Sequence, residues 1–287
     1  MKIAVIGAGE MGQWLAAFAK QNLGEVVVAD ISATKAELVA KELGISSKSV
    51  AEAAARAEIV LVAVPISKTP EIIKSLAGRV QRGTLLSDIA SVKSDVVEVM
   101  KTIKAKVELV SIHPLFGPGA ATVRGKDFLV VPVTPGKRYD ALKNRLIELG
   151  AQVTEMEAEE HDRLMAITQC MTHFVLISYL DALKSMKGLE KAEKLRTPMF
   201  AMLLDLAKAV LAGNPELYGE LQVHNRYARV ARSLLLEACR SLDIAFSAGD
   251  VKSVRAIFEE ALAPWGLDKT KNAYKRMYKR FEEEGKT

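Results

Sequence analysis

The chain has 287 residues, of which 49% are hydrophobic and 26% are charged, and its formal net charge is +5. This length and composition are ordinary for a soluble protein of two domains, and they exclude disordered and fibrous classes. Basic residues alternate with acidic ones along most of the chain, so the positive charge favours a small anionic substrate over nucleic acid.

The sequence predicts a cytoplasmic protein with no membrane partner. No continuous apolar run approaches the roughly 20 residues that span a bilayer, and the chain enters an apolar strand pattern directly after Met1. Cys170 and Cys239 lie in helical patterns without metal-ligand spacing. We therefore expect buried free thiols in a reducing compartment, without a disulfide or a metal site.

From Lys2 to about Met156, short apolar runs alternate with helical stretches. The runs lie at residues 3–6, 26–29, 59–64, 84–87, 107–112, 128–131 and 152–155. Strands that alternate with helices are typical of crossover units and a largely parallel sheet. Continuous apolar runs, such as 59–64, fit strands that are buried on both faces. Residues 1–156 are therefore predicted to form an α/β domain with a Rossmann-type doubly wound parallel sheet.

The strand pattern stops after Met156. The rest of the chain is rich in Leu, Ala, Met, Lys and Glu at helical spacing, with breaks at Gly and Pro. Residues 157–287 are therefore predicted to form an all-helical domain. The apolar faces of these helices are more extensive than one small bundle can bury, so we expect a homodimer through this domain.

The segment Gly7–Gly12 matches the pattern GxGxxG between an apolar run and a helical pattern. In this context Gly7 permits the tight turn, Gly9 lets the backbone approach a pyrophosphate, and Gly12 allows close helix packing. The start of the helix supplies N–H donors to the anion. The alternative is a glycine-rich turn that binds no nucleotide. The predicted cofactor-binding residues of the loop are Gly7, Ala8, Gly9, Glu10, Met11 and Gly12.

Asp30 ends the second predicted strand, about 20 residues after the loop, where a carboxylate can accept hydrogen bonds from the adenosine ribose hydroxyls. A carboxylate there would repel a 2′-phosphate, so NAD is predicted in preference to NADP. Val64 and Pro65 follow the next strand at the same sheet edge. We expect their loop to cover the adenosine or ribose of the cofactor.

His113 follows the apolar run 107–112, and Ser91 and Lys93 follow the preceding strand. Ligands gather at the carboxyl ends of parallel strands. His113 alone among these groups has an unperturbed pKa near neutrality, so it is the predicted general base, with Ser91 as catalytic helper and Lys93 as a substrate-binding cation. Two alternatives remain: His113 as a structural turn residue, and Ser91 as the N-cap of a helix over 92–103.

His161, Met165, Gln169 and His173 follow one another at steps of four, which places three polar groups along one stripe of an apolar helix. A buried helix does not carry such a stripe without partners. The stripe either lines a cleft that faces the nicotinamide or forms a hydrogen-bond ladder between helices. Gln169 and His173 are predicted to bind substrate. For His161 both roles, in the cleft or in the ladder, remain alternatives.

Taken together, these motifs resemble the prephenate dehydrogenase family of tyrosine biosynthesis. The resemblance implies a helical second domain that forms a dimer, NAD as cofactor, and oxidative decarboxylation of prephenate to 4-hydroxyphenylpyruvate. It also implies that His113 contacts the ring hydroxyl of the substrate and that Ser91 assists it. The matching segments are Gly7–Gly12, Ser91–Lys93, His113–Gly117, His161–Asp162, Gln169 with Thr172–Phe174, and Pro215–Tyr218.

The chain departs from the family at one position. Similar members usually place an arginine that binds a substrate carboxylate in the helix before the segment matched by Pro215–Tyr218. Here Ala209 stands at that position with Lys208 beside it, and consecutive helix residues point about 100° apart. Lys208 and Arg226 are predicted as candidate cations, with Arg229 or Arg232 as further possibilities.

The departure leaves prephenate and arogenate as alternative substrates. A related hydroxyacid dehydrogenase and a non-catalytic NAD-binding regulator are further alternatives.

Overall fold

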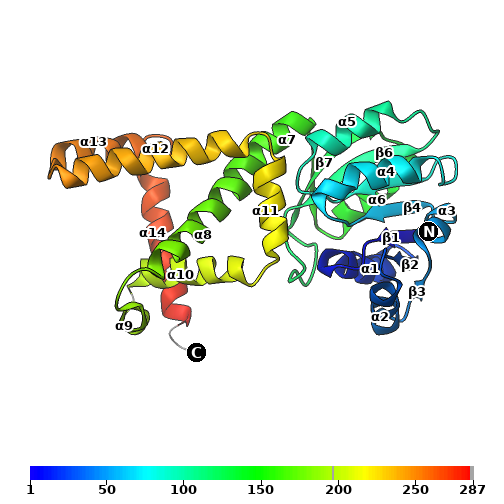
Figure 1. The fold of residues 1–287 in the computed structure, drawn as a ribbon, viewed down its shortest axis with the longest axis horizontal. Coiled ribbons are helices and arrows are strands. Elements are labelled where there is room, and N and C mark those ends of the chain that lie inside the picture. Colours follow the sequence, from blue (N-terminus) through cyan, green and yellow to red (C-terminus); the bar gives the residue numbers. More distant parts are fainter. Residues whose placement is uncertain (196, 285–287) are drawn as a thin grey trace. The chain divides into compact units, whose positions relative to one another are not determined.

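The computed structural model describes residues 1–195 and 197–284. The chain forms two compact units: one contains Met1–Met165 and Val223–Arg226, and the other contains Ala166–Gln222 and Tyr227–Thr287 (Figure 1). The first unit extends beyond the predicted boundary at residue 156, because helix α7 (Ala158–Met165) packs against helix α5 (Ser94–Thr102).

An eight-stranded sheet with the order β3-β2-β1-β4-β5-β6-β7-β8 forms the centre of the first unit. All neighbouring strands run parallel except β6 and β7, which are antiparallel. The prediction of a Rossmann-type, largely parallel sheet is confirmed. The strands are β1 (Lys2–Ile6), β2 (Glu25–Ala29), β3 (Ser46–Ser47), β4 (Ile59–Val62), β5 (Leu85–Asp88), β6 (Glu108–Pro114), β7 (Asp127–Thr134) and β8 (Gln152–Glu155).

The sheet differs from the prediction in three details. Strand β3 has only two residues and no apolar run to reveal it. Strand β4 ends at Val62, so Ala63 and Val64 belong to the following loop. The connection from β6 to β7 contains no helix. Without a crossover helix the chain turns back beside β6, which produces the antiparallel pair.

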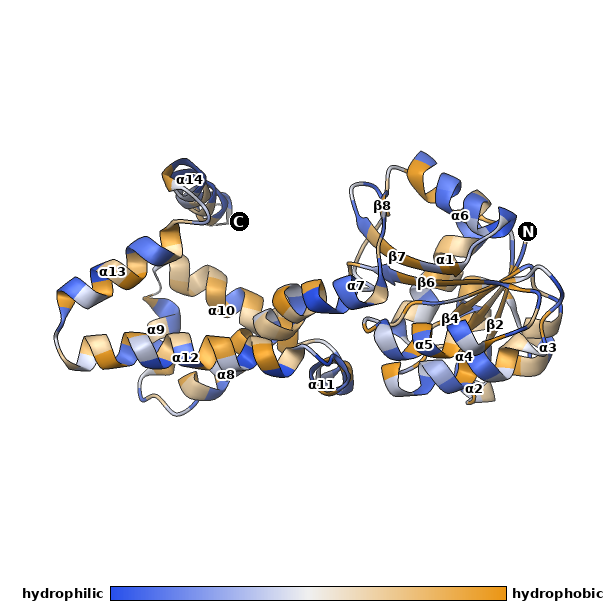
Figure 2. Cartoon of the chain, turned by 90° about the horizontal axis from the view of Figure 1, so that it is seen from above, coloured by the Kyte–Doolittle hydropathy of each residue, from blue (hydrophilic) through white to orange (hydrophobic). Residues whose placement is uncertain are grey.

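Helices cover both faces of this sheet, and two hydrophobic clusters fill the space between them. Ile3 and Val5 of β1 belong to the cluster beneath α1 and α6, whereas Ala4 and Ile6 belong to the one beneath α3, α4 and α5. Both faces of the strands are thus buried, and they appear apolar in Figure 2. The remaining helices are α1 (Glu10–Asn22), α2 (Ala33–Leu43), α3 (Val50–Ala55), η1 (Ile66–Lys68), α4 (Thr69–Ala77) and α6 (Lys137–Glu148).

The second unit is all-helical in its described residues, as predicted. One hydrophobic cluster among its described residues has Leu176, Ala207 and Val210 at the centre. Large apolar side chains such as Phe246, Phe258 and Trp265 are exposed. Its elements are the π-helix η2 (Ala166–Met171), α8 (Thr172–Leu183), α9 (Leu189–Lys194), α10 (Pro198–Leu211), α11 (Pro215–His224), α12 (Ala228–Ser247), α13 (Val251–Leu262) and α14 (Leu267–Glu284), although the end of α11 belongs to the first unit.

One continuous helix, Ala158–Leu183, is long and apolar enough to cross a membrane by length and composition alone. Scattered polar residues hide it from a search for continuous apolar runs. A helix packed in a soluble protein passes the same test, so the observation is weak support for a membrane span.

The two cysteines are both free thiols, but they lie in different surroundings. Cys170 is fully buried, and its Sγ lies 3.6 Å from the carbonyl oxygen of Leu221. Cys239 is exposed on helix α12. The prediction of two buried thiols was therefore wrong for Cys239, because its helical pattern alone did not reveal which face of the helix is covered.

Candidate active site

The loop after β1 is tightly packed at Gly7 and Gly12 and has open space at Gly9. Gly7 has a φ of 113°, and a Cβ there would lie 2.1 Å from the carbonyl oxygen of Ala63. A Cβ at Gly12 would lie 1.9 Å from the carbonyl oxygen of Gly7. A Cβ at the exposed Gly9, in contrast, would meet nothing within 4 Å. The open backbone before α1 therefore fits an approaching phosphate.

Asp30 connects the end of β2 to this loop. Its Oδ2 accepts a hydrogen bond from the Ala8 N–H at 2.7 Å, and its Oδ1 accepts one from the Ser32 N–H at 2.8 Å. Each carboxylate oxygen has a second lone pair, so Asp30 can hold the loop and still accept from ribose hydroxyls. The residues present thus fit a dinucleotide at this edge.

The loop that carries Val64 and Pro65 lies beside the glycine-rich loop. The Ala63 N–H donates to the carbonyl oxygen of Ile6 at 2.7 Å, which continues the pairing of β1 with β4. Val64 is half-buried and Pro65 is exposed. The structure therefore brings the predicted cofactor-binding residues together at the carboxyl edge of β1, β2 and β4.

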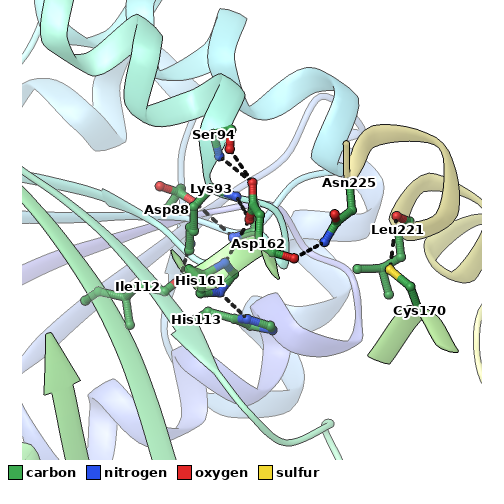
Figure 3. Close-up of polar contacts among 11 residues, drawn as sticks. Asp88, Lys93, Ser94, Ile112, His113, His161, Asp162, Cys170, Leu221 and Asn225 are labelled. Carbon is green, nitrogen blue, oxygen red and sulfur yellow. Dashed lines mark hydrogen bonds and ion pairs between the residues drawn. The ribbon is translucent and has the colours of Figure 1, made fainter. Parts of the chain in front are cut away.

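His113 lies at the carboxyl end of β6 and is only 2% exposed. Its Nδ1 lies 2.9 Å from Nε2 of His161, and Nδ1 of His161 lies 2.8 Å from Oδ1 of Asp162 (Figure 3). His161 and Asp162 are fully buried on α7. The general base predicted from sequence therefore belongs to a buried series of an imidazole, a second imidazole and a carboxylate.

The Asp162 carboxylate also caps helix α5. It accepts hydrogen bonds from the Lys93 N–H at 2.8 Å and the Ser94 N–H at 2.9 Å, and the Ser94 hydroxyl donates to it at 2.5 Å. Helix α5 begins at Ser94, with Lys93 at the N-cap position. The alternative of Ser91 as the N-cap is not what the structure shows, because helix α5 begins later and a carboxylate distant in sequence serves its free N–H groups. Ser91 is half-buried in the loop between β5 and α5.

Lys93 occupies a different position from that expected of a substrate-binding cation. Its side chain is fully buried, and its Nζ donates to Oδ1 of Asp88 at 3.1 Å and to the carbonyl oxygen of Ile112 at 2.7 Å. Burial lowers the pKa of Lys93, while the negative charge of Asp88 opposes that change. The Lys93 side chain therefore links Asp88 at the end of β5 to Ile112, the residue before His113.

Burial decides the protonation of the two histidines. It lowers the pKa of His113 well below 6.5, and the neighbouring His161 and Lys93 act in the same direction. Burial likewise lowers the pKa of His161. For Asp162, burial raises the pKa, but hydrogen bonds from His161, Ser94 and the backbone outweigh burial and lower it overall. At neutral pH both imidazoles are therefore neutral and the carboxylate is ionised.

Gln169 and His173 do not continue an α-helical stripe from His161. Gln169 lies in the π-helix η2, where the α-helical spacing of the prediction is broken. His173 packs edge-on against Tyr218, with ring centroids 4.7 Å apart, and its buried Nδ1 has no hydrogen-bond partner among the described residues. Gln169 and His173 belong to the second unit, whereas His161 belongs to the first.

The two candidate cations Lys208 and Arg226 each have an acidic neighbour, whereas Arg232, a further possibility, donates to the side-chain and carbonyl oxygens of Gln222. Lys208 forms an ion pair with Glu193. Arg226 pairs with Asp95 at 3.3 Å and with Glu98 at 3.1 Å, and these carboxylates raise its pKa. Both cations are exposed. A substrate carboxylate would therefore compete with an existing partner at either position.

Several hydrogen-bond partners of Lys93 and Asp162 had no role predicted from the sequence. Asp88 and Ser94 bond to Lys93 and Asp162, and the Asn225 side chain donates to the carbonyl oxygen of Asp162 at 2.8 Å. The pair His161–Asp162 was the available signal for Asp162. Within the described residues, no group of three or more His, Cys, Asp or Glu side chains could hold a metal ion.

Two family models match consecutive parts of the chain. The nucleotide-binding domain of prephenate dehydrogenase matches residues 15–155, and the dimerization domain of prephenate dehydrogenase matches residues 157–260. The chain belongs to the prephenate dehydrogenase family. The first unit is accordingly the family's nucleotide-binding domain, which agrees with the open glycine-rich loop.

Relatives of the chain are named for different substrates. The chain is 29% identical over 281 residues to a probable arogenate/prephenate dehydrogenase of Methanocaldococcus jannaschii, a match that covers 96% of this chain and 63% of the relative. It is 29% identical over 265 residues to the 4-amino-4-deoxyprephenate dehydrogenase of Streptomyces pristinaespiralis, covering 90% of this chain and 88% of that protein.

The fold also resembles solved structures. The prephenate dehydrogenase of Aquifex aeolicus in complex with hydroxyphenyl propionate and NAD+ has a TM-score of 0.71 at 18% identity, covering 92% of this chain and 97% of that one. An arogenate dehydrogenase from Synechocystis has a TM-score of 0.69 at 18% identity, covering 92% of this chain and 98% of that one. At this identity the likeness establishes the shared fold.

Proposed function

We propose that the chain catalyses an NAD-dependent oxidative decarboxylation in tyrosine biosynthesis, with prephenate as substrate. The products are 4-hydroxyphenylpyruvate, carbon dioxide and NADH. The observation that carries the proposal is the position of His113: a buried, neutral imidazole at the carboxyl edge of a sheet whose glycine-rich loop fits a dinucleotide. Family membership supports the substrate class.

The glycine-rich loop and Asp30 would hold NAD, and the N–H groups at the start of α1 would bind its pyrophosphate. When bound there, NAD supplies an acceptor for the hydride that leaves C4 of the substrate ring. Asp30 would accept from the ribose hydroxyls and disfavour a 2′-phosphate.

His113 takes the proton of the C4 hydroxyl in this scheme as the C4–O bond becomes a carbonyl. The bond between C1 and the ring carboxylate then breaks, its electrons enter the ring, and the oxygen at C4 regains a proton as the ring becomes aromatic. Burial supports the role of His113, because the pKa lowered by burial keeps the imidazole unprotonated and able to accept. Ser91, half-buried in the loop after β5, is proposed to assist it by hydrogen bonding.

We further propose that the protein is cytoplasmic and assembles as a homodimer through its helical unit. The many exposed apolar side chains of that unit support this assembly, as does the match to a dimerization domain. Gln169 and His173 remain proposed substrate ligands. Lys208 or Arg226 is proposed to bind a substrate carboxylate after exchanging its acidic partner.

Arogenate dehydrogenase is the second candidate, because the names of the relatives include arogenate as well as prephenate. The test is the absorbance of NADH with purified protein, NAD and either prephenate, arogenate or 4-amino-4-deoxyprephenate, with NADP in parallel. Preferred turnover of prephenate with NAD supports the proposal. Preferred turnover of one of the other substrates would reassign the activity, and NAD binding without turnover of any of them would favour a non-catalytic regulator.

A further inference from the structure

A hydrogen-bonded series leads from Asp162 through His161 to His113. The two contacts are 2.8 Å, between Oδ1 of Asp162 and Nδ1 of His161, and 2.9 Å, between Nε2 of His161 and Nδ1 of His113. All three side chains are buried. Each contact needs one donor and one acceptor, so the protonation of one end constrains the other.

The proton positions follow from the carboxylate. An ionised Asp162 can only accept, so Nδ1 of His161 must carry a hydrogen. In a neutral imidazole the other nitrogen is then an acceptor, and Nε2 of His161 accepts from Nδ1 of His113. A neutral His113 with hydrogen on Nδ1 presents Nε2 as an acceptor.

We propose that Asp162, acting through His161, is a positioning residue that fixes the tautomer of His113 so that Nε2 can accept the substrate proton. This inference rests on the proposed function for its catalytic meaning. Its structural statement, that Nε2 of His113 carries no hydrogen, can be tested in the ligand-free protein.

The surroundings of Asp162 favour this role. Two backbone N–H groups and the Ser94 hydroxyl hold its carboxylate, and the Asn225 amide holds its main chain. These bonds stabilise the ionised form and prevent the side chain from turning away from His161. The charged groups nearest the series are Lys93 and Asp88, which form an ion pair with each other.

The alternative is that Asp162 serves only as the cap of α5. Asp162→Asn separates the two roles in part: with its amide nitrogen in the place of Oδ1, its oxygen in the place of Oδ2 can still accept from the N–H and hydroxyl of Ser94, and only the Lys93 N–H loses its acceptor. An amide nitrogen that faces Nδ1 of His161 would instead donate, which would reverse both imidazoles and place the hydrogen of His113 on Nε2. Ser94→Ala is the matched control, since it removes one cap bond and leaves the contact between Asp162 and His161 intact.

The direct test is the ¹⁵N spectrum of the ring nitrogens in the full, ligand-free chain labelled at histidine. The chain has only 4 histidines, so single substitutions can assign the signals. The expected result is an unprotonated Nε2 on His113 in the wild type and in Ser94→Ala, and a protonated Nε2 in Asp162→Asn. A protonated Nε2 in the folded wild type would overturn the inference, even if Asp162→Asn did not fold.

Kinetics then measure the consequence. Asp162→Asn should lower kcat by up to about 10⁴-fold, the loss that the same change causes in a serine protease triad, with NAD affinity retained. Ser94→Ala should stay within a few-fold of the wild type. Equal losses in the two variants would assign Asp162 a capping role alone. If the wild type shows the expected tautomer but turns over no substrate, the proposed function fails and the tautomer assignment stands.

Discussion

The glycine-rich loop (Gly7–Gly12) and the histidine cluster (Asp88, Lys93, His113, His161 and Asp162) lie at the carboxyl edge of one sheet but differ in construction. The loop presents an open backbone at Gly9, where no side chain intervenes. The cluster consists of side chains that are almost completely removed from water. Backbone N–H groups suit an anion that must enter from solvent. An imidazole that is shielded from water stays unprotonated and can accept a proton. Changes in the two regions should therefore affect binding and chemistry separately.

The largest expected effect is on the chemical step. His113→Asn should lower kcat by about 10² to 10⁴-fold, because it removes the general base, while the Kd for NAD should stay near that of the wild type. Steady-state kinetics and NAD titration of the same preparation measure both quantities. Near-normal turnover in this variant would show that His113 is not the base.

Lys93→Met should reduce the free energy of unfolding by about 3–5 kcal/mol, because it leaves the buried Asp88 without its cation. Urea unfolding measures this change. The control is Lys35→Met, an exposed position where a change within about 0.5 kcal/mol is expected. Similar stabilities for the two variants would mean that the buried ion pair contributes little to folding.

Two glycine variants of the loop should behave differently. Gly9→Ala should fold normally, because its Cβ meets open space, but should bind NAD about tenfold more weakly if a phosphate occupies that space. Gly12→Ala should lose stability, because its Cβ would overlap the carbonyl oxygen of Gly7. Calorimetric titration and thermal unfolding distinguish the two effects. Unchanged NAD affinity in Gly9→Ala would place the pyrophosphate elsewhere.

The smallest expected effect is on the pH dependence of stability. The pKa of His113 is lowered in the folded state, so below about pH 6.5 the unfolded chain binds a proton that the folded chain does not. Stability should therefore fall as the pH drops below that value, and less steeply in His113→Asn. Unfolding curves between pH 5 and about 8 test this. Equal pH dependence in both proteins would mean that folding does not lower the pKa of His113.

The glycine-rich loop could be predicted from sequence because its requirements are local. Gly7, Gly12 and the flanking apolar run stand within a short segment, and the Cβ that Gly12 lacks would meet the carbonyl oxygen of Gly7 in the same loop. The contact that excludes a Cβ at Gly7, with the carbonyl oxygen of Ala63 after β4, could not be seen from the segment itself. The central strands could also be predicted, because both of their faces are buried and their sequences are continuously apolar, whereas the two-residue strand β3 at the edge has no such run.

The histidine cluster could be predicted only in part. His113 was identified by its place after a strand, but its contact with His161 joins residues 48 positions apart, and the bond from Ser94 to Asp162 spans 68. Nothing local marks such pairs. The π-helix was also missed, since a wider turn changes the spacing of Gln169 without changing the apolar composition.

The most direct test of the proposed reaction uses prephenate deuterated at C4, with NAD and the purified chain. Hydride transfer from C4 predicts that one deuterium appears on the reduced nicotinamide for each 4-hydroxyphenylpyruvate and each carbon dioxide formed, as measured by mass spectrometry. Turnover with the deuterium released to water, or no turnover while NAD remains bound, would contradict hydride transfer from C4.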